Sequence, residues 1–371
     1  MAEMIKPLSV YIHIPFCVAK CSYCDFASYP GQEGAWEAYF AALRGEIAGA
    51  ADGEHRVQTV FLGGGTPSLV PARQIEATLA AVRSAFALAP DAEISLEANP
   101  GTLSMEKLRA YRQMGVNRLS IGAQSFDGAI LRDIGRIHTP QQAEQAVAMA
   151  REAGFSNVGL DLMYGLPGQS AAAWRDTLQK ALALGVEHVS AYALIVEENT
   201  PMAARVGELP GEEEVLAMQR EATALLSRAG LERYEISNYA RRGFACRHNL
   251  VYWLRGEYRG FGCAAHSFFA GERFANPAPL DAYLAGRRAD SCAAVTREEA
   301  IEETILLSTR TCRGLSLEAF AREFGQDFRR GREARLERLR AAGLLTLEDG
   351  FLRLTPRGME VHNAVVLELI D

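Results

Sequence analysis

The sequence lacks the features that would assign the protein to a membrane, to the cell exterior or to nucleic acid. No stretch reaches eighteen apolar residues, so we expect no transmembrane helix. The beginning, MAEMIKPLSV, lacks the charged and then apolar layout of a signal peptide, and we therefore expect a cytoplasmic protein. There is no excess of positive charge: the net charge of −7 argues against a general nucleic-acid binder.

Cysteine is scarce, and its number is odd. Seven cysteines without a secretory signal argue against a disulfide framework. Three of them, Cys17, Cys21 and Cys24, lie close together near the start of the chain. The other four are scattered, so the three grouped thiols need an explanation of their own.

Strand and helix patterns alternate through the first part of the chain. Strands are expected at Ser9–Ile14, Thr59–Leu62, Glu93–Ala98, Arg118–Ile121, Asn157–Met163 and His188–Val196. Helices are expected between them at Gly34–Ala48, Pro71–Phe86, Ser104–Met114, Pro140–Ala153 and Ala171–Leu184. The alternation predicts βαβ units and a parallel sheet. Six units are too few for an eightfold barrel, so we predict an α/β fold with a partial (β/α)6 barrel over residues 1–210. A doubly wound sheet is the alternative.

The pattern changes beyond residue 210. A helix at Glu212–Ala229, a strand at Glu232–Ser237 and a Gly- and aromatic-rich stretch predict a helix and strand extension over residues 211–295. In residues 296–371, three helical patterns precede a hairpin around Asp349-Gly350, which is typical of an α+β winged-helix-like module. Its basic residues are interleaved with acids, so we expect a structural or protein-binding role and argue against nucleic acid.

The grouped cysteines follow the first predicted strand, at the end of the barrel where active sites form. Closely spaced thiolates can bind three corners of a [4Fe–4S] cluster. The fourth iron would then have an open position, which is where metal sites carry out chemistry. Unpaired structural thiols and a zinc site are the alternatives. A zinc site needs a fourth ligand, for which His13 on the preceding strand is nearest.

The CxxxCxxC spacing resembles the signature of the radical S-adenosyl-L-methionine (SAM) superfamily. The chain is similar over nearly its whole length to the oxygen-independent coproporphyrinogen III oxidase-like family of that superfamily. The similar segments are Tyr11–Cys17, Gly63–Pro67, Glu97–Pro100, Ile121–Phe126, Gly135–His138 and Asp161–Gly168. The resemblance implies that Cys17, Cys21 and Cys24 hold one [4Fe–4S] cluster, that its free iron binds SAM, and that an electron donor reduces it. Reductive cleavage of SAM is then open to this scaffold in principle.

The resemblance also implies which side chains surround SAM. They are Tyr11, Tyr23, Gly64, Gly65, Thr66, Glu97, Gln124, Arg136 and Asp161. Each has a plainer interpretation: a tight turn for the glycines, an exposed rim carboxylate for Glu97, an ordinary ion pair between Arg136 and Asp161, and core packing for the tyrosines. The sequence identifies no catalytic residue.

Two departures distinguish the chain from the oxidase branch of this family. The oxidases resemble CxxxCxxCxC, but the last position here is Phe26, and Cys17 lies near the start where the oxidases carry a longer extension. Both departures argue against decarboxylation of coproporphyrinogen III. The segments Cys246–Trp253, with an HNxxYW pattern, and Tyr258–Ser267 are similar to the HemW-type heme chaperone branch. That branch implies binding of heme and its delivery to heme-requiring respiratory proteins, including membrane-associated ones.

The resemblance makes His248 the first heme ligand to consider, because neutral imidazole is a common axial ligand of heme iron. Tyr252 and Trp253 could enclose the porphyrin. His266 and Cys246 are weaker alternatives, and the plainer interpretation of His248 is a structural histidine. The absence of CxxCH argues against covalent attachment. We therefore hypothesise a heme chaperone on a SAM-binding scaffold; the alternatives are an oxidase-type enzyme of porphyrin biosynthesis and a radical SAM enzyme that modifies RNA.

Overall fold

Six adjacent parallel strands form the centre of the molecule. The computed structural model describes residues 6–287 and 291–370. The six strands are β1 (Lys6–Ile14), β4 (His55–Gly64), β5 (Ala87–Ala98), β6 (Arg118–Gln124), β7 (Val158–Tyr164) and β8 (His188–Ala193), in that spatial order. Each pairs in parallel with the next. This order confirms the predicted α/β fold with a partial (β/α)6 barrel.

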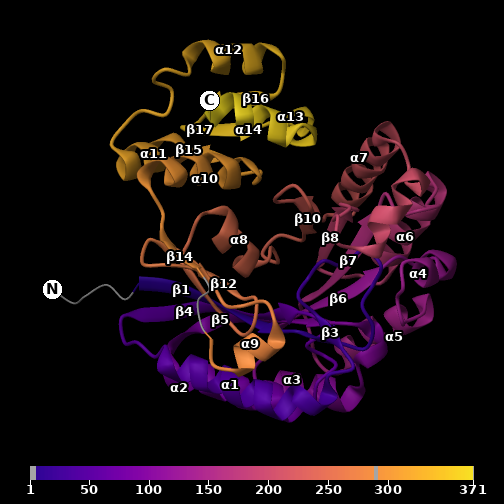
Figure 1. The fold of residues 1–371 in the computed structure, drawn as a ribbon. Helices are drawn as coiled ribbons and strands as arrows, with labels where there is room; N and C mark the ends of the chain where they lie inside the picture. The colour runs from indigo at the N-terminus through magenta and orange to yellow at the C-terminus, as the bar shows by residue number, and fades with distance from the viewer. Residues whose placement is uncertain (1–5, 288–290, 371) are drawn as a thin grey trace.

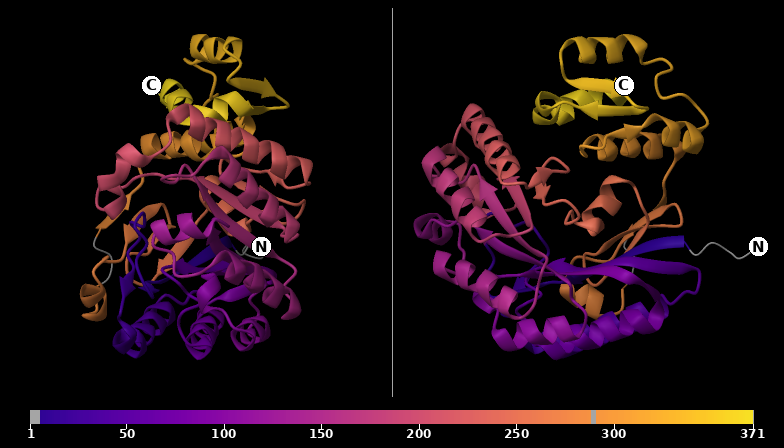
Figure 2. Two further views of the ribbon diagram at one scale, coloured as in Figure 1. Left: turned by 90° about the vertical axis from the view of Figure 1, so that its right-hand side faces the viewer. Right: turned by 180° about the vertical axis from the view of Figure 1, so that it is seen from behind.

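Helices cover the outer face of the curved sheet and leave its concave face open (Figures 1 and 2). They are α1 (Trp36–Gly49), α2 (Ala72–Ala85), α3 (Met105–Gln113), α4 (Gly128–Asp133), α5 (Pro140–Glu152) and α6 (Ala171–Ala183). Local signals fix their starts: Ser104 accepts a hydrogen bond from the Lys107 amide, and Thr139 forms a capping box with Gln142 before Pro140. The sheet–helix interface is apolar, with Trp174 of α6 completely buried.

The sheet is extended at both ends by the segment after the barrel. Beside β1 lies β11 (Tyr258–Phe261), parallel to it, followed by the antiparallel strands β12 (His266–Phe269), β13 (Glu272–Ala275) and β14 (Ser291–Ala294). Beside β8 lie β10 (Asn238–Ala240) and β9 (Glu232–Arg233), both antiparallel to their neighbours. The predicted strand at Glu232–Ser237 is thus wrong beyond Arg233, because the chain turns there before pairing with β8.

Three helices belong to this extension: α7 (Glu212–Arg228), α8 (Arg247–Trp253) and α9 (Leu280–Leu284). The predicted helix at Glu212–Ala229 is present as α7. Buried side chains of the extension, such as Leu226, Tyr239 and Phe261, belong to the same hydrophobic core as the barrel. The extension therefore completes the barrel wall, and α8 lies over its concave side (Figure 1).

The last part of the chain has its own hydrophobic core. It contains α10 (Arg297–Thr309), β15 (Leu315–Ser316), α11 (Leu317–Phe324), α12 (Glu333–Ala341), β16 (Leu345–Glu348), β17 (Phe351–Leu354), α13 (Pro356–Glu360) and α14 (His362–Ile370). The hairpin turn has left-handed backbone at both Asp349 (φ 53°) and Gly350 (φ 78°), as a type I′ turn requires. The sequence patterns did not predict α13 and α14. In the part of the chain that the structure describes, no helix is long and apolar enough to cross a membrane.

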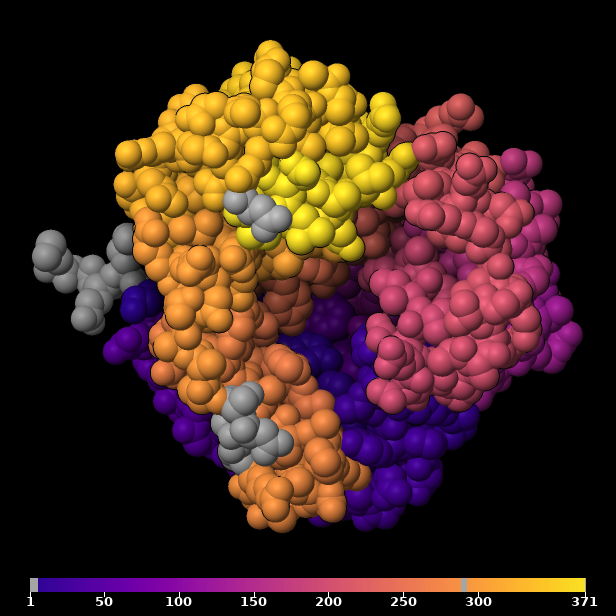
Figure 3. All heavy atoms as spheres, turned by 45° about the horizontal axis from the view of Figure 1, so that its top comes forward, coloured from indigo at the N-terminus to yellow at the C-terminus, as the bar shows by residue number. Residues whose placement is uncertain are grey.

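This module contacts the extension through α10 and the residues that follow it. The guanidinium of Arg310 lies 4.5 Å from the ring centroid of Trp253 and 3.5 Å from the carboxylate of buried Glu235. Arg255, just after α8, pairs with Glu303 at 3.0 Å. The space-filling view shows a hollow between this module and the barrel (Figure 3). The module therefore forms one side of the opening to the concave face.

Candidate functional site

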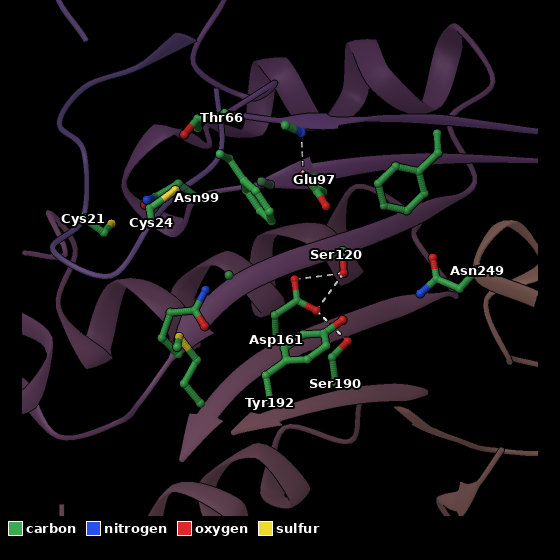
Figure 4. Close-up of a pocket in the computed structure, with 18 of the residues that line it drawn as sticks. Cys21, Cys24, Thr66, Glu97, Asn99, Ser120, Asp161, Ser190, Tyr192 and Asn249 are labelled. Carbon is green, nitrogen blue, oxygen red and sulfur yellow. Dashed lines mark hydrogen bonds between the residues drawn. The ribbon is translucent and has the colours of Figure 1, made fainter. Parts of the chain in front are cut away.

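A cavity of about 480 Å³ lies at the carboxyl ends of the parallel strands. This is the end at which barrels of this type place their active sites. All ten residues predicted from the resemblance to surround SAM or heme line it: Tyr11, Tyr23, Gly64, Gly65, Thr66, Glu97, Gln124, Arg136, Asp161 and His248. Cys21 and Cys24 line it as well (Figure 4). The structure thus brings these residues together; that they bind SAM or heme stays a prediction.

The cysteine loop is held by contacts to its backbone. The short strands β2 (Phe16–Cys17) and β3 (Tyr29–Pro30) pair in parallel and close its base. The Ser22 amide donates to the carbonyl of Ile134 at 3.2 Å, and the Ser22 carbonyl accepts from the Met202 amide at 2.9 Å. These contacts join the loop to the segments after β6 and β8. Hydrogen bonds to the barrel rim therefore fix the shape of the loop.

The sulfur atoms of the loop receive hydrogen bonds. The Thr66 hydroxyl lies 3.5 Å from Cys17 Sγ, and Arg136 Nη1 lies 3.6 Å from Cys21 Sγ. Burial raises the pKa of the Cys17 and Cys24 thiols. A cysteine binds a metal as its thiolate, and hydrogen-bond donors to sulfur are one means by which proteins tune iron–sulfur clusters. The residues present therefore fit a cluster held by Cys17, Cys21 and Cys24.

The zinc alternative finds little support in the geometry. Both ring nitrogens of His13 are hydrogen-bonded, one to the Tyr11 hydroxyl at 3.0 Å and the other to the carbonyl of Ala27 at 2.8 Å. His13 thus braces the cysteine loop and has no free nitrogen for a metal. Within residues 6–287 and 291–370, no three His, Cys, Asp or Glu side chains converge on a single metal position.

The glycine loop after β4 packs so closely that side chains would not fit. A Cβ at Gly64, which has a φ of +109°, would lie 2.5 Å from the His13 ring. A Cβ at Gly65 would lie 2.8 Å from backbone atoms of Phe16. The Gly65 amide donates to the Ile14 carbonyl at 2.9 Å, and the Thr66 amide to the Phe16 carbonyl at 2.7 Å. The loop is therefore a tight turn, as the plainer interpretation had it, and it also lines the cavity.

Two carboxylates form an acidic part of the cavity wall (Figure 4). Glu97 accepts a hydrogen bond from the Gly64 amide at 3.0 Å, and burial together with the nearby charge of Asp161 raises its pKa to about 7. Asp161 accepts hydrogen bonds from the hydroxyls of Ser120 at 3.0 Å and Ser190 at 2.7 Å. Such a wall suits a ligand with cationic groups, as SAM has in its ammonium and sulfonium.

Arg136 and Gln124 complete the wall near the cysteines. Arg136 Nη2 donates to the carbonyl of Gly122 at 2.5 Å and Nη1 lies near Cys21 Sγ, whereas Asp161 accepts from two serine hydroxyls. Among the described residues, Arg136 and Asp161 thus do not form the ion pair that the sequence left open. Gln124 has a left-handed backbone (φ 63°) where the pairing of β6 with β7 shifts its register. A non-glycine residue in this conformation is uncommon and is often found at functional sites. The left-handed backbone at this register shift therefore favours a functional role for Gln124 over that of an ordinary strand residue.

The opposite side of the cavity is formed by α8. The ring of His248 is buried, with Nδ1 2.7 Å from the Thr59 hydroxyl and Nε2 2.8 Å from the Tyr252 hydroxyl. It also stacks on Phe61, with ring centroids 5.1 Å apart. Burial, with the charge of Arg118, lowers its pKa to about 3, so the imidazole is neutral. Ligation of heme by His248 would require one of these hydrogen bonds to break.

The structure adds residues that the sequence patterns missed. Ser120, Ser190 and Tyr192 line the cavity, as does Asn249 of the HNxxYW pattern, for which no role was predicted (Figure 4). A signal for Ser190 exists in the strand register, because Ser190 on β8 is the direct partner of Asp161 on β7. Trp253, in contrast, does not line this cavity, because its ring lies under Arg310 of the C-terminal module.

Comparisons with known proteins agree with this arrangement. The model of the Radical SAM superfamily matches residues 11–181, and that of the HemN C-terminal domain matches residues 295–361. The fold also resembles the solved coproporphyrinogen III oxidase (HemN) from Escherichia coli, described as a radical SAM enzyme. That likeness has a TM-score of 0.86 at 24% identity and covers 99% of this chain and 91% of the other. At this identity it shows the fold alone. The class of protein is thus a radical SAM protein, whose cofactors are a [4Fe–4S] cluster and SAM.

Curated relatives define the family more closely. Heme chaperone HemW of Bacillus subtilis is 36% identical over 96% of this chain and 97% of its own length. Heme chaperone HemW of Mycobacterium tuberculosis is 39% identical over 98% of this chain and 95% of its own length. Heme chaperone HemW of Escherichia coli is 43% identical over 71% of this chain and 70% of its own length. The chain belongs to the HemW family of radical SAM proteins.

Proposed function

We propose that this protein is a heme chaperone, which binds heme and transfers it to acceptor proteins. The observation that carries the proposal is the similarity to relatives named heme chaperones over almost the whole of both chains. That similarity extends beyond the barrel to the extension and the C-terminal module. The parts of the molecule that distinguish it from a bare radical SAM barrel are therefore shared with those relatives.

In this proposal the barrel holds the cluster and SAM. Cys17, Cys21 and Cys24 would hold the cluster, and the wall around Glu97 and Asp161 would hold SAM. When bound to a reduced cluster, SAM can supply a radical. The residues of this chain orient the ligand: the Gly64 amide fixes the carboxyl of Glu97, and two serine hydroxyls fix that of Asp161.

An oxygen-independent coproporphyrinogen III oxidase is the second function to consider. Its support is the likeness of fold to HemN, which does not extend to activity. Against it stands Phe26, which occupies the position of the further cysteine of the oxidases and is 61% exposed beside the cavity. We therefore favour a carrier of heme over an enzyme of porphyrin synthesis.

The protein partners follow from the same proposal. The acceptors would be heme-requiring respiratory proteins, including membrane-associated ones, and an electron donor would reduce the cluster. A cytoplasmic location is consistent with the seven cysteines, all of which are free thiols. Affinity chromatography with the heme-loaded protein as bait, followed by mass spectrometry, would identify the acceptors.

Anaerobic reconstitution followed by heme titration tests the proposal. Absorption spectra should show saturable binding of heme, and the same sample supplied with SAM and reductant should leave coproporphyrinogen III unchanged. Absence of heme binding, together with conversion of coproporphyrinogen III, would assign the protein to the oxidase branch instead.

A further inference from the structure

A second cavity of about 400 Å³ adjoins the first. The two share Tyr11, Phe26, Gly64, Glu97 and Tyr252 as lining residues, so they are separated by little more than these side chains. The second cavity alone is lined by Tyr258 and His266, from the strands that extend the sheet beside β1. It lies next to the SAM wall but contains none of the three cluster cysteines.

His266 differs from every other histidine of the chain. The sequence has seven, all of them described by the structure. Six are buried, and each has a ring nitrogen in a hydrogen bond: His13, His55, His138, His188, His248 and His362. His266 is exposed, and its ring forms no hydrogen bond with the described residues. It is therefore the imidazole whose free ring nitrogen is available to an incoming metal.

The surroundings of His266 are aromatic. Tyr252 and Tyr258 meet edge to face, with ring centroids 4.6 Å apart, and Phe26 exposes 61% of its surface beside them. A flat apolar ligand would remove these faces from water, and burial of apolar area favours binding. Aromatic walls with one free imidazole are what an iron porphyrin requires of a binding site.

We propose that the second cavity is the heme site and that His266 is the axial ligand of the heme iron. The inference rests on the proposed function and makes it specific. A ring nitrogen of His266 donates its lone pair to the iron and replaces a solvent ligand there, with no change of oxidation state. His248 then has a different part: it positions Tyr252, which belongs to the wall of both cavities.

An exposed ligand on the rim also suits transfer. A carrier must release its cargo to an acceptor, and an imidazole that is free of hydrogen bonds can leave the iron without disrupting the fold. His248 would lack this property, because one of its hydrogen bonds joins α8 to Thr59 of β4 and the other fixes Tyr252 within α8. The difference between these two histidines is what the experiment must measure.

Hemin titration of the reconstituted protein, read by absorption spectroscopy, separates the two. His266→Ala should weaken hemin binding by about tenfold or more, because loss of even an outer-shell partner of a metal ligand commonly costs about tenfold or more in metal affinity. Free imidazole added to this variant should restore the spectrum. In the reduced protein, resonance Raman spectra should contain an iron–histidine band in wild type and His248→Gln but not in His266→Ala.

A matched control variant completes the test. Cys292→Ser removes an exposed thiol from β14, two strands away, and should bind hemin as wild type does. Unchanged hemin affinity and an unchanged iron–histidine band in His266→Ala would overturn the assignment, as would loss of the band in His248→Gln alone. Failure of wild type to bind hemin at all would instead contradict the proposed function.

Discussion

The two sides of the main cavity are built in different ways. On the barrel side, backbone contacts fix the cysteine and glycine loops, and the predicted site side chains line the cavity. On the α8 side, residues of the HNxxYW motif themselves stabilise the wall. His248 is hydrogen-bonded to Thr59 and Tyr252, and Trp253 contacts the C-terminal module through the guanidinium of Arg310. A sequence motif therefore shows that a segment is shared within a family. Only the contacts in the structure show whether a motif residue is free to bind a ligand or supports the cavity wall.

The largest contrast should come from the cysteines. Cys21→Ser removes one of three thiolates and the partner of Arg136, so the reconstituted protein should lose essentially all of its cluster absorbance and bound iron. Cys292→Ser is the matched control, because that thiol is exposed and far along the chain. Equal iron content in both variants would contradict the assignment of the cluster to the loop. Iron analysis and absorption spectroscopy measure the effect.

Alanine variants at His248 and His266 should differ almost as clearly in their free energy of unfolding. His248→Ala leaves a void beside Phe61 and two hydroxyls without their partner, at a cost of about 4 kcal/mol in the free energy of unfolding. His266→Ala changes an exposed ring and should stay within about 0.5 kcal/mol of wild type. Urea denaturation of the apo proteins gives both values. Similar values for the two would contradict the structural part given to His248.

The raised pKa of Glu97 in the acidic wall should make the free energy of unfolding depend on pH. The pKa of Glu97 rises from 4.5 to about 7 on folding, so the stability gained from its protonated form is fully present below pH 4.5 and is lost as the pH rises through about 7. Relative to Glu97→Gln, wild type should lose up to about 3 kcal/mol across this range. Denaturation of both proteins at several pH values measures the difference. A difference that is constant with pH would show that Glu97 has an ordinary pKa.

The glycine loop should give the smallest of these effects. Gly65→Ala places a methyl group 2.8 Å from the Phe16 backbone, which should destabilise the fold by about 2 kcal/mol. Gly45→Ala, in α1, meets nothing within 4 Å and should stabilise it by about 0.5 kcal/mol. Thermal or chemical denaturation distinguishes the two. Equal stabilities would mean that the loop can move away from the cysteine strand.

Much of the barrel could be predicted from the sequence because its signals are local. Each of the six strands is an apolar run followed by glycine or polar residues, and helix starts such as Ser104 and Thr139 carry their own caps. Residues that follow successive parallel strands meet at one edge, which is why the predicted SAM residues converge. Thr66, Glu97 and Asp161 themselves were predicted from the family resemblance, and the strand topology explains why they meet in one cavity.

Helix α8, strand β11 and the position of His248 could not be predicted, because they depend on contacts between residues far apart in the sequence. Helix α8 has seven residues and no side-chain cap of its own; Glu93, from β5, accepts hydrogen bonds from the amides of Arg247 and His248. Strand β11 inserts beside β1 through contacts some 250 residues apart in sequence. The hydrogen bond of His248 to Thr59 likewise joins α8 to β4. Periodicity and composition contain no trace of such pairings.

Transfer of heme is the most direct test of the central claim. Heme-loaded protein would be mixed anaerobically with a heme-free acceptor protein, and the absorption of each would be followed after rapid separation. The account predicts that heme moves to the acceptor while coproporphyrinogen III, supplied with SAM and reductant, stays unconverted. Heme that stays on the chain, together with decarboxylation of coproporphyrinogen III, would contradict the assignment as a chaperone.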